Sequence, residues 1–116
     1  MNSYSKINLN LKKAIMGNNF GEVKKLVNKI PYTIQKPIID SAFRFASENG
    51  DLMLMEYLII HYAADINSQN SNGDTALILA LEGNNLEVLN FLIEKGANLD
   101  LQNKDRNNAL MLALKK

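Results

Sequence analysis

A period of 33 residues constrains the fold of this chain more than any other feature. The stretch from Asn70 to Asp100 opens NSNGDTALILA, continues GNNLEVLNFLI and closes EKGANLD, and the next stretch repeats its opening as NKDRNNALMLAL. The same columns can be followed back toward the N-terminus at spacings of 34 and then 32 residues. Self-similarity at such a period is typical of repeat proteins, in which each unit is one supersecondary element stacked on the next.

Apolar residues recur in the same columns of each unit. Two columns of the first helix hold Leu11, Phe43, Leu77 and Leu110, and then Ala14, Ala46, Ala80 and Ala113. Within a unit the apolar residues fall at i, i+3, i+4 and i+6 or i+7, so each predicted helix has one apolar stripe that it cannot bury alone. The helices must therefore cover one another, and the alanine column predicts a close approach of the two helices of a unit.

This frame resembles the ankyrin-repeat family, whose unit reads roughly D-x-x-G-x-T-P-L-H-x-A-A, G-H-L-E-V-V-x-L-L-L and x-x-G-A-x-x-N. The resemblance is closest over residues 70–102, good over 36–67, partial over 4–30 and cut short over 103–116. It implies an all-α solenoid of stacked helix-turn-helix units joined by β-hairpin-like loops. We expect one domain over residues 1–116, with an N-terminal cap and three further units at 4–35, 36–69, 70–102 and 103–116, the last of them truncated.

Helix starts are predicted from side chains that can accept a hydrogen bond from an unpaired backbone N–H. The N-cap column of the later units holds Ser41, Thr75 and Asn108. In the first unit this column holds Leu9, so Asn8 or Ser5 is expected to cap the helix instead.

Turns are predicted where the repeat needs a positive backbone φ. The position between the two helices of a unit holds Asn18, Gly50 and Asn84. Asn72-Gly73 is a strong tight-turn dipeptide and is expected at the tip of a projecting hairpin. The second unit carries one extra residue before Ala64, which predicts a lengthened helix end; alternatively, His61 and Tyr62 form a protruding contact point.

The two ends of the chain differ from the repeat. Lys13 and Lys25 stand where later units have large apolar residues, so the first unit is expected to be a cap, with the natural N-terminus near residue 1. After the stripe of Leu110, Ala113 and Leu114 there is no second helix, which predicts an exposed edge. Three explanations stay open: the segment is cut from a longer solenoid, which we favour; a partner or a second copy covers the edge by self-association; or the end frays.

Composition narrows the possible functions. With no cysteine and one histidine, the chain has no disulfide framework, thiolate metal site or histidine cluster, and we expect no cofactor. No apolar run approaches the length that crosses a bilayer, and no secretory signal is present, so we expect no membrane contact and an intracellular, cytoplasmic location. An abundance of Asn, Lys and Ile suggests A/T-rich codons, so the location would be the host cytoplasm if the source is a pathogen or virus.

Neither catalysis nor nucleic-acid binding is expected. Asp40-Ser41 or Asp74-Thr75 could be drawn as a triad with His61, but both hydroxyls are already assigned to helix caps. A basic N-terminal face is formed by Lys12, Lys13, Lys24, Lys25 and Lys29. Such a face is usually a solvated cap, and residues 37–100, with ten acidic and two basic residues, would repel a long polyanion.

Resemblance to the family implies that a partner protein, of unknown identity, binds at the hairpin tips and the concave face of the first helices. The implied contact residues are Gln69, Ser71, Asn72, Asp74, Ile78, Glu82, Gln102, Lys104, Asp105, Asn107, Met111 and Lys115. Ile78 and Met111 replace the family's His in a column that otherwise holds Lys12 and Arg44. They form an apolar spot on the groove or, alternatively, pack against each other. The alternative function is an N-terminal scaffold or targeting segment of a larger effector, adaptor or enzyme, with no activity of its own.

Overall fold

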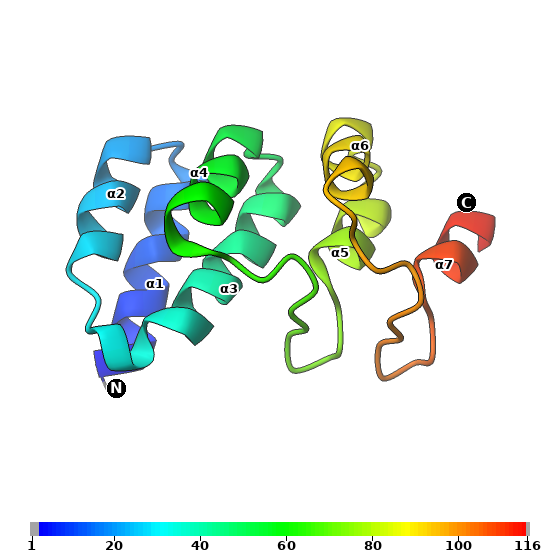
Figure 1. The fold of residues 1–116 in the computed structure, drawn as a ribbon, viewed down its shortest axis with the longest axis horizontal. Coiled ribbons are helices and arrows are strands. Elements are labelled where there is room, and N and C mark those ends of the chain that lie inside the picture. Colours follow the sequence, from blue (N-terminus) through cyan, green and yellow to red (C-terminus); the bar gives the residue numbers. More distant parts are fainter. Residues whose placement is uncertain (1–2, 116) are drawn as a thin grey trace.

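The computed structural model describes residues 3–115, and within that range the chain consists of seven α-helices and connecting loops, with no strand. The helices are α1 (Ser3–Met16), α2 (Phe20–Asn28), α3 (Tyr32–Asn49), α4 (Leu52–Tyr62), α5 (Ala76–Glu82), α6 (Leu86–Glu94) and α7 (Ala109–Lys115). They form an elongated stack of 41 × 25 × 22 Å (Figure 1). The predicted all-α repeat solenoid is therefore confirmed.

The first helices of the units form one continuous row. α1 packs on α3, α3 on α5 and α5 on α7, while α2, α4 and α6 each pack on the first helix of their own unit (Figure 1). Ala14, Ala46 and Ala80 are buried at these close approaches, as the small column predicted. Ala113 in the same column is exposed, because no described helix packs beside α7 to complete its unit.

The predicted helix caps are confirmed in the last two units and wrong in the first two. Thr75 Oγ1 accepts a hydrogen bond from Ile78 N at 3.2 Å, and Asn108 Oδ1 accepts one from Met111 N at 2.9 Å. Ser41 lies inside α3, which begins at Tyr32, so it is not an N-cap. Asn8 and Ser5, the expected caps of the first unit, likewise lie inside α1.

A helical extension of α3 explains why Ser41 does not begin a helix. The residues before Ser41 continue the helix instead of forming a hairpin, and they bury Ile38 and Ile39. Burying two such side chains contributes about 1.5–3 kcal/mol each. That gain offsets the cost of Pro37, which lacks a backbone N–H and costs a helix interior about 3 kcal/mol. The predicted boundary between residues 35 and 36 consequently falls within a continuous helix.

The different roles of Thr75 and Ser41 give a stability test within one repeat column. Thr75→Ala is expected to cost about 1 kcal/mol of unfolding free energy, because the buried N–H of Ile78 loses its acceptor. Ser41→Ala is expected to cost nothing or to stabilise slightly, since alanine is the better residue inside a helix. Urea titration followed by circular dichroism measures both values. Equal losses in the two variants would mean that Ser41 also begins a helix.

The left-handed turns follow the prediction. Asn18, Gly50 and Asn84 have φ values of 54°, 76° and 55°. In the second unit the extra residue lengthens α4, which ends at Tyr62, and Ala63 takes the left-handed position at φ 51°. The lengthened helix end is therefore confirmed. The Tyr62 hydroxyl donates a hydrogen bond to Asn28 Oδ1, which ties this helix end to the first unit.

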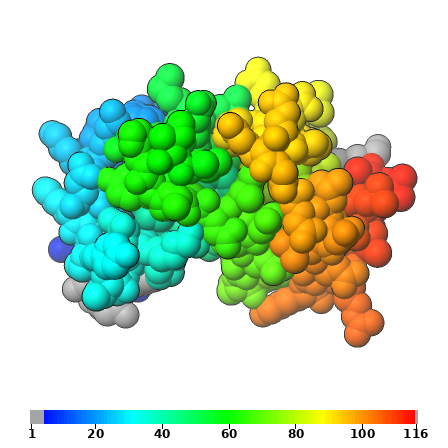
Figure 2. Space-filling model, viewed as in Figure 1, coloured from blue at the N-terminus to red at the C-terminus, as the bar shows by residue number. Residues whose placement is uncertain are grey.

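Two hairpin-like loops join the last three units, over residues 65–75 and 98–108. In the first, Asn70 N donates to Asp74 O at 3.0 Å and Gly73 N donates to Asn70 O at 2.9 Å. Both loops project on the same side of the stack (Figure 1), and the second stands out from the molecular surface in orange (Figure 2). Lys104 N donates to Asn72 O at 2.9 Å, so adjacent tips are hydrogen-bonded to each other.

Candidate functional site

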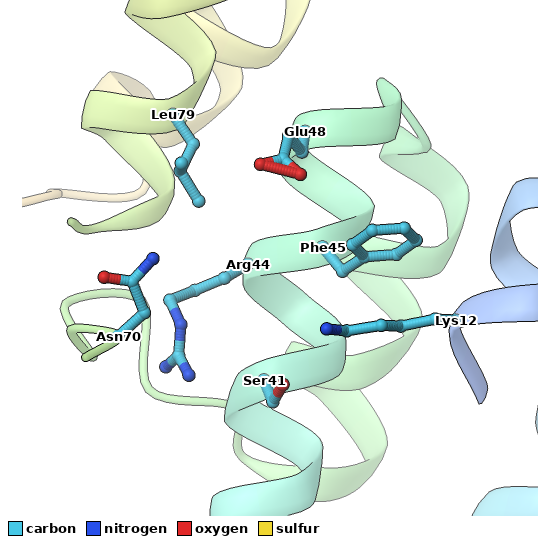
Figure 3. Close-up of a pocket in the computed structure, with 7 residues that line it drawn as sticks. All are labelled: Lys12, Ser41, Arg44, Phe45, Glu48, Asn70 and Leu79. Carbon is cyan, nitrogen blue, oxygen red and sulfur yellow. The ribbon is translucent and has the colours of Figure 1, made fainter. Parts of the chain in front are cut away.

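A polar hollow lies on the face of α3 between α1 and α5, and we call it the α3 pocket (Figure 3). It is lined by Lys12, Ser41, Arg44, Phe45, Glu48, Asn70 and Leu79. Its volume is about 130 Å³. The hollow has room for side chains of a bound segment.

Four of the residues that line the α3 pocket come from one face of α3. Ser41, Arg44, Phe45 and Glu48 stand at i, i+3, i+4 and i+7 on α3, and this spacing lines up side chains along one helix face. One wall is Lys12 from α1. The opposite wall combines Asn70 from the first hairpin loop with Leu79 from α5. Three successive units therefore contribute to one site.

Charge is distributed unevenly along the α3 pocket. Arg44 Nη1 donates to Ser68 Oγ at 2.6 Å, and Lys12 Nζ lies 5.6 Å from the centre of the Phe45 ring, a cation–π distance. Figure 3 shows the Arg44 guanidinium and Ser41 toward one end of the pocket and the Glu48 carboxylate toward the other. The pocket thus has a donor-rich end and an acceptor end, with the Phe45 ring and Leu79 also lining it.

None of the twelve sequence-predicted contact residues lines the α3 pocket. Nine of them are exposed: Gln69, Ser71, Asn72, Glu82, Gln102, Lys104, Asp105, Met111 and Lys115. Asn107 is half-buried, while Asp74 and Ile78 are buried. The sequence did contain one sign of this pocket. Lys12 and Arg44, which line it, are the two charged residues of a repeat column that otherwise holds the apolar Ile78 and Met111.

Two of these expectations need correction. Ile78 is only 1% exposed, so it is no part of an apolar spot on the groove; α5 packs against α3 on one side and α7 on the other. Asp74 is also buried, and its Oδ1 accepts a hydrogen bond from Asn103 Nδ2 at 2.9 Å in the next loop. Its carboxylate therefore joins two units and is not displayed to a partner. Met111 is 42% exposed and stays available.

An apolar hollow lies at the C-terminal end of the stack. Its lining residues are Leu77, Leu81, Leu89, Ile93, Leu99, Ala109, Leu110 and Ala113. Leu110 and Leu114 are largely exposed beside it, as expected for an uncovered edge. Self-association through this edge stays a prediction, which the concentration dependence of sedimentation would test.

Two further observations concern the described residues alone. Nowhere in residues 3–115 do three His, Asp or Glu side chains gather in an arrangement that could hold a metal ion. None of the helices in that range combines the length and the hydropathy needed to cross a bilayer.

Comparison with known proteins places these features in a family. A model of ankyrin repeats in three copies matches residues 43–116. The NAD-capped RNA hydrolase NUDT12 of Homo sapiens is 32% identical over 79 residues, which are 68% of this chain and 17% of the hydrolase. A putative ankyrin repeat protein of Rickettsia bellii is 51% identical over 70 residues, covering 56% of this chain and 42% of that protein.

Among solved structures, a chain from the complex of a predatory endopeptidase of Bdellovibrio bacteriovorus with an immunity protein is similar. It superposes with a TM-score of 0.57 at 36% identity, covering 63% of this chain and 38% of that chain. This chain therefore spans less than half the length of each of these relatives. The family match begins at Phe43, beyond the α3 extension that replaces a hairpin, and it covers well over half of the sequence. With its stacked helix pairs and projecting loops, the chain belongs to the ankyrin-repeat family.

Proposed function

We propose that this chain is a protein-interaction module that binds a segment of a partner protein across the row of first helices, with the α3 pocket as the anchor point. Ankyrin repeats generally serve as protein–protein interaction modules. The observation that carries the proposal is the pocket itself, in which side chains from three units converge on a volume of about 130 Å³. Charged and apolar groups lie within side-chain reach of one another there.

The scaffold under the α3 pocket supports this assignment. Phe43, Ala46 and Ser47 lie on the opposite side of α3 and are fully buried, and Ser47 Oγ donates to Ala76 O of α5 at 2.9 Å. A binding face on helices that are fixed in this way loses little conformational entropy when a ligand docks. The exposed tip residues Ser71, Asn72 and Lys104 flank the same row and provide further contacts. We assign no catalytic role to the chain.

A second candidate is a scaffold or targeting segment of a larger protein, without independent activity. Its support is the partial coverage of the relatives, of which this chain spans 17% to 42%. The similar chain in the endopeptidase complex is found in a structure with a bound protein, which favours the first candidate. For either candidate we propose that the chain acts inside the cell, in the cytoplasm, and fractionation of cells that produce it would test this.

Site-specific photo-crosslinking distinguishes the two candidates. A photoreactive phenylalanine analogue replaces Phe45 in the α3 pocket or, as the matched control, Met53, which is exposed on α4 away from the pocket. In cells that produce the chain, we expect protein adducts from position 45 at several times the yield from position 53. Equal yields would contradict binding at the pocket, and the lack of any adduct at either position would favour the segment without independent binding.

A further inference from the structure

The two cations of the α3 pocket come from equivalent places in successive units. Lys12 on α1 and Arg44 on α3 occupy one repeat column, so their side chains leave neighbouring, packed helices in the same direction. The next two residues of that column, Ile78 and Met111, carry no charge. The positive charges of this column are therefore confined to the first two units, where the pocket lies.

The extension of α3 adds a further donor at this end. Because the helix begins at Tyr32, the Ser41 hydroxyl is not used as an N-cap and lines the pocket with Lys12 and Arg44. A lysine ammonium has three N–H donors and a serine hydroxyl has one, while an arginine guanidinium has five, of which Arg44 uses at least one for its bond to Ser68 Oγ. An ionised carboxylate only accepts hydrogen bonds, so it is the side-chain group that this end of the pocket suits best.

Glu48 restricts the charge of the ligand residue that contacts the other end of the pocket. It stands seven residues after Ser41 on the same helix, which corresponds to about 10 Å along the axis. A second acidic group on the ligand at that distance would face a like charge, which destabilises binding. A lysine, an arginine or a neutral donor is favoured there instead. Phe45 and Leu79 also line the pocket and give the ligand apolar contacts.

From this geometry we infer that the α3 pocket recognises one aspartate or glutamate side chain of a partner segment, held by Lys12, Arg44 and Ser41. The residue that reaches Glu48 is basic or neutral, so an unbroken run of acidic residues does not fit. The inference rests on the proposed function, since it names the chemistry of the partner at that same pocket.

Selection from a random peptide library on the whole chain tests the inference. The peptides are displayed as N-terminal fusions, so that they present no free C-terminal carboxylate, and a second library presents free C-termini. Affinities of the enriched peptides are measured by fluorescence anisotropy for the wild type, Lys12→Gln and Arg44→Gln. The matched control is Lys13→Gln, which removes the neighbouring charge on α1 outside the α3 pocket. Thermal melting of each variant confirms that it is folded.

Enriched peptides are expected to contain one acidic residue. Changing that residue to its amide, or changing Lys12 or Arg44 to Gln, should weaken binding about tenfold or more, because each change removes a charge-assisted hydrogen bond. Lys13→Gln should leave the affinity within about twofold. Glu48→Gln should improve the binding of a variant peptide with a second acidic residue, which the wild-type pocket disfavours.

Three results would overturn the inference, and they separate it from the proposed function. If peptides depend on Lys12 or Arg44 but bind equally well as amide analogues, the pocket binds protein segments without recognising an acid. If only the library with free C-termini yields binders, the group recognised is a terminal carboxylate. If no peptide is selected, or none depends on any residue of the pocket, the inference and the proposed function both fail.

Discussion

Phe43→Ala is expected to lower the free energy of unfolding by about 3–5 kcal/mol, the usual cost of deleting a fully buried aromatic side chain. Phe43 is 0% exposed and lies on α3, which packs against both α1 and α5. A small domain has about 5–15 kcal/mol of stability in total, so this variant should melt far below the wild type. Guanidinium titration followed by circular dichroism measures the loss.

Tyr32→Ala is the matched control for this aromatic deletion. Tyr32 is on the same helix but 90% exposed, so its replacement should change the unfolding free energy by less than about 0.5 kcal/mol. A loss below about 1 kcal/mol for Phe43→Ala would mean that the first helices do not cover one another in a stack.

Gly73→Ala is expected to be much more harmful than Gly96→Ala, although both glycines have a left-handed backbone. Their φ values are 78° and 84°, so each substitution costs about 1–2 kcal/mol of backbone strain. A Cβ atom on Gly73 would lie 2.8 Å from Asn103 Cα, whereas one on Gly96 would meet nothing within 4 Å. The clash with backbone should add about 1–3 kcal/mol to the cost at Gly73.

The same unfolding titration on the two alanine variants isolates this contact, because the strain is common to both. The difference between them reports how tightly the first hairpin tip is held against the second. Equal losses would contradict the close approach of the tips and, with it, the hydrogen bond from Lys104 N to Asn72 O.

The sequence was sufficient to predict the repeat frame, and it failed where local packing overrode that frame. Thr75 and Asn108 follow a hairpin-like loop and cap their helices as their column suggests. Ser41 occupies the same column but follows Ile38 and Ile39, whose burial keeps the preceding residues helical. Those apolar residues are visible in the sequence, but the repeat column by itself favours a helix that begins at Ser41.

Prediction of the binding residues was limited by a different cause. A repeat column states which residues occupy equivalent positions, but the burial of each one depends on the side chains that the neighbouring units place beside it. Arg44 and Ile78 share a column, yet Arg44 lines an open pocket whereas Ile78 is buried. The hydrogen bond from Asn103 Nδ2 to Asp74 Oδ1 joins residues 29 positions apart, and the sequence pattern of a single unit does not predict it.

The extension of α3 also has a mechanical consequence. Because α3 runs through the boundary between the first two units and packs on α1, while the Lys36 ammonium bonds to both Asp40 and the Ala63 carbonyl at the end of α4, one continuous helix joins the first two units. The third unit packs on the same helix through α5, and Ser47 Oγ of α3 donates to Ala76 O of α5. The α3 pocket spans this contact, with Lys12 and Arg44 on one side and Leu79 on the other. A substitution that tilts α5 against α3 would therefore change the width of the pocket, so the curvature of the stack and the affinity for the proposed partner segment are coupled.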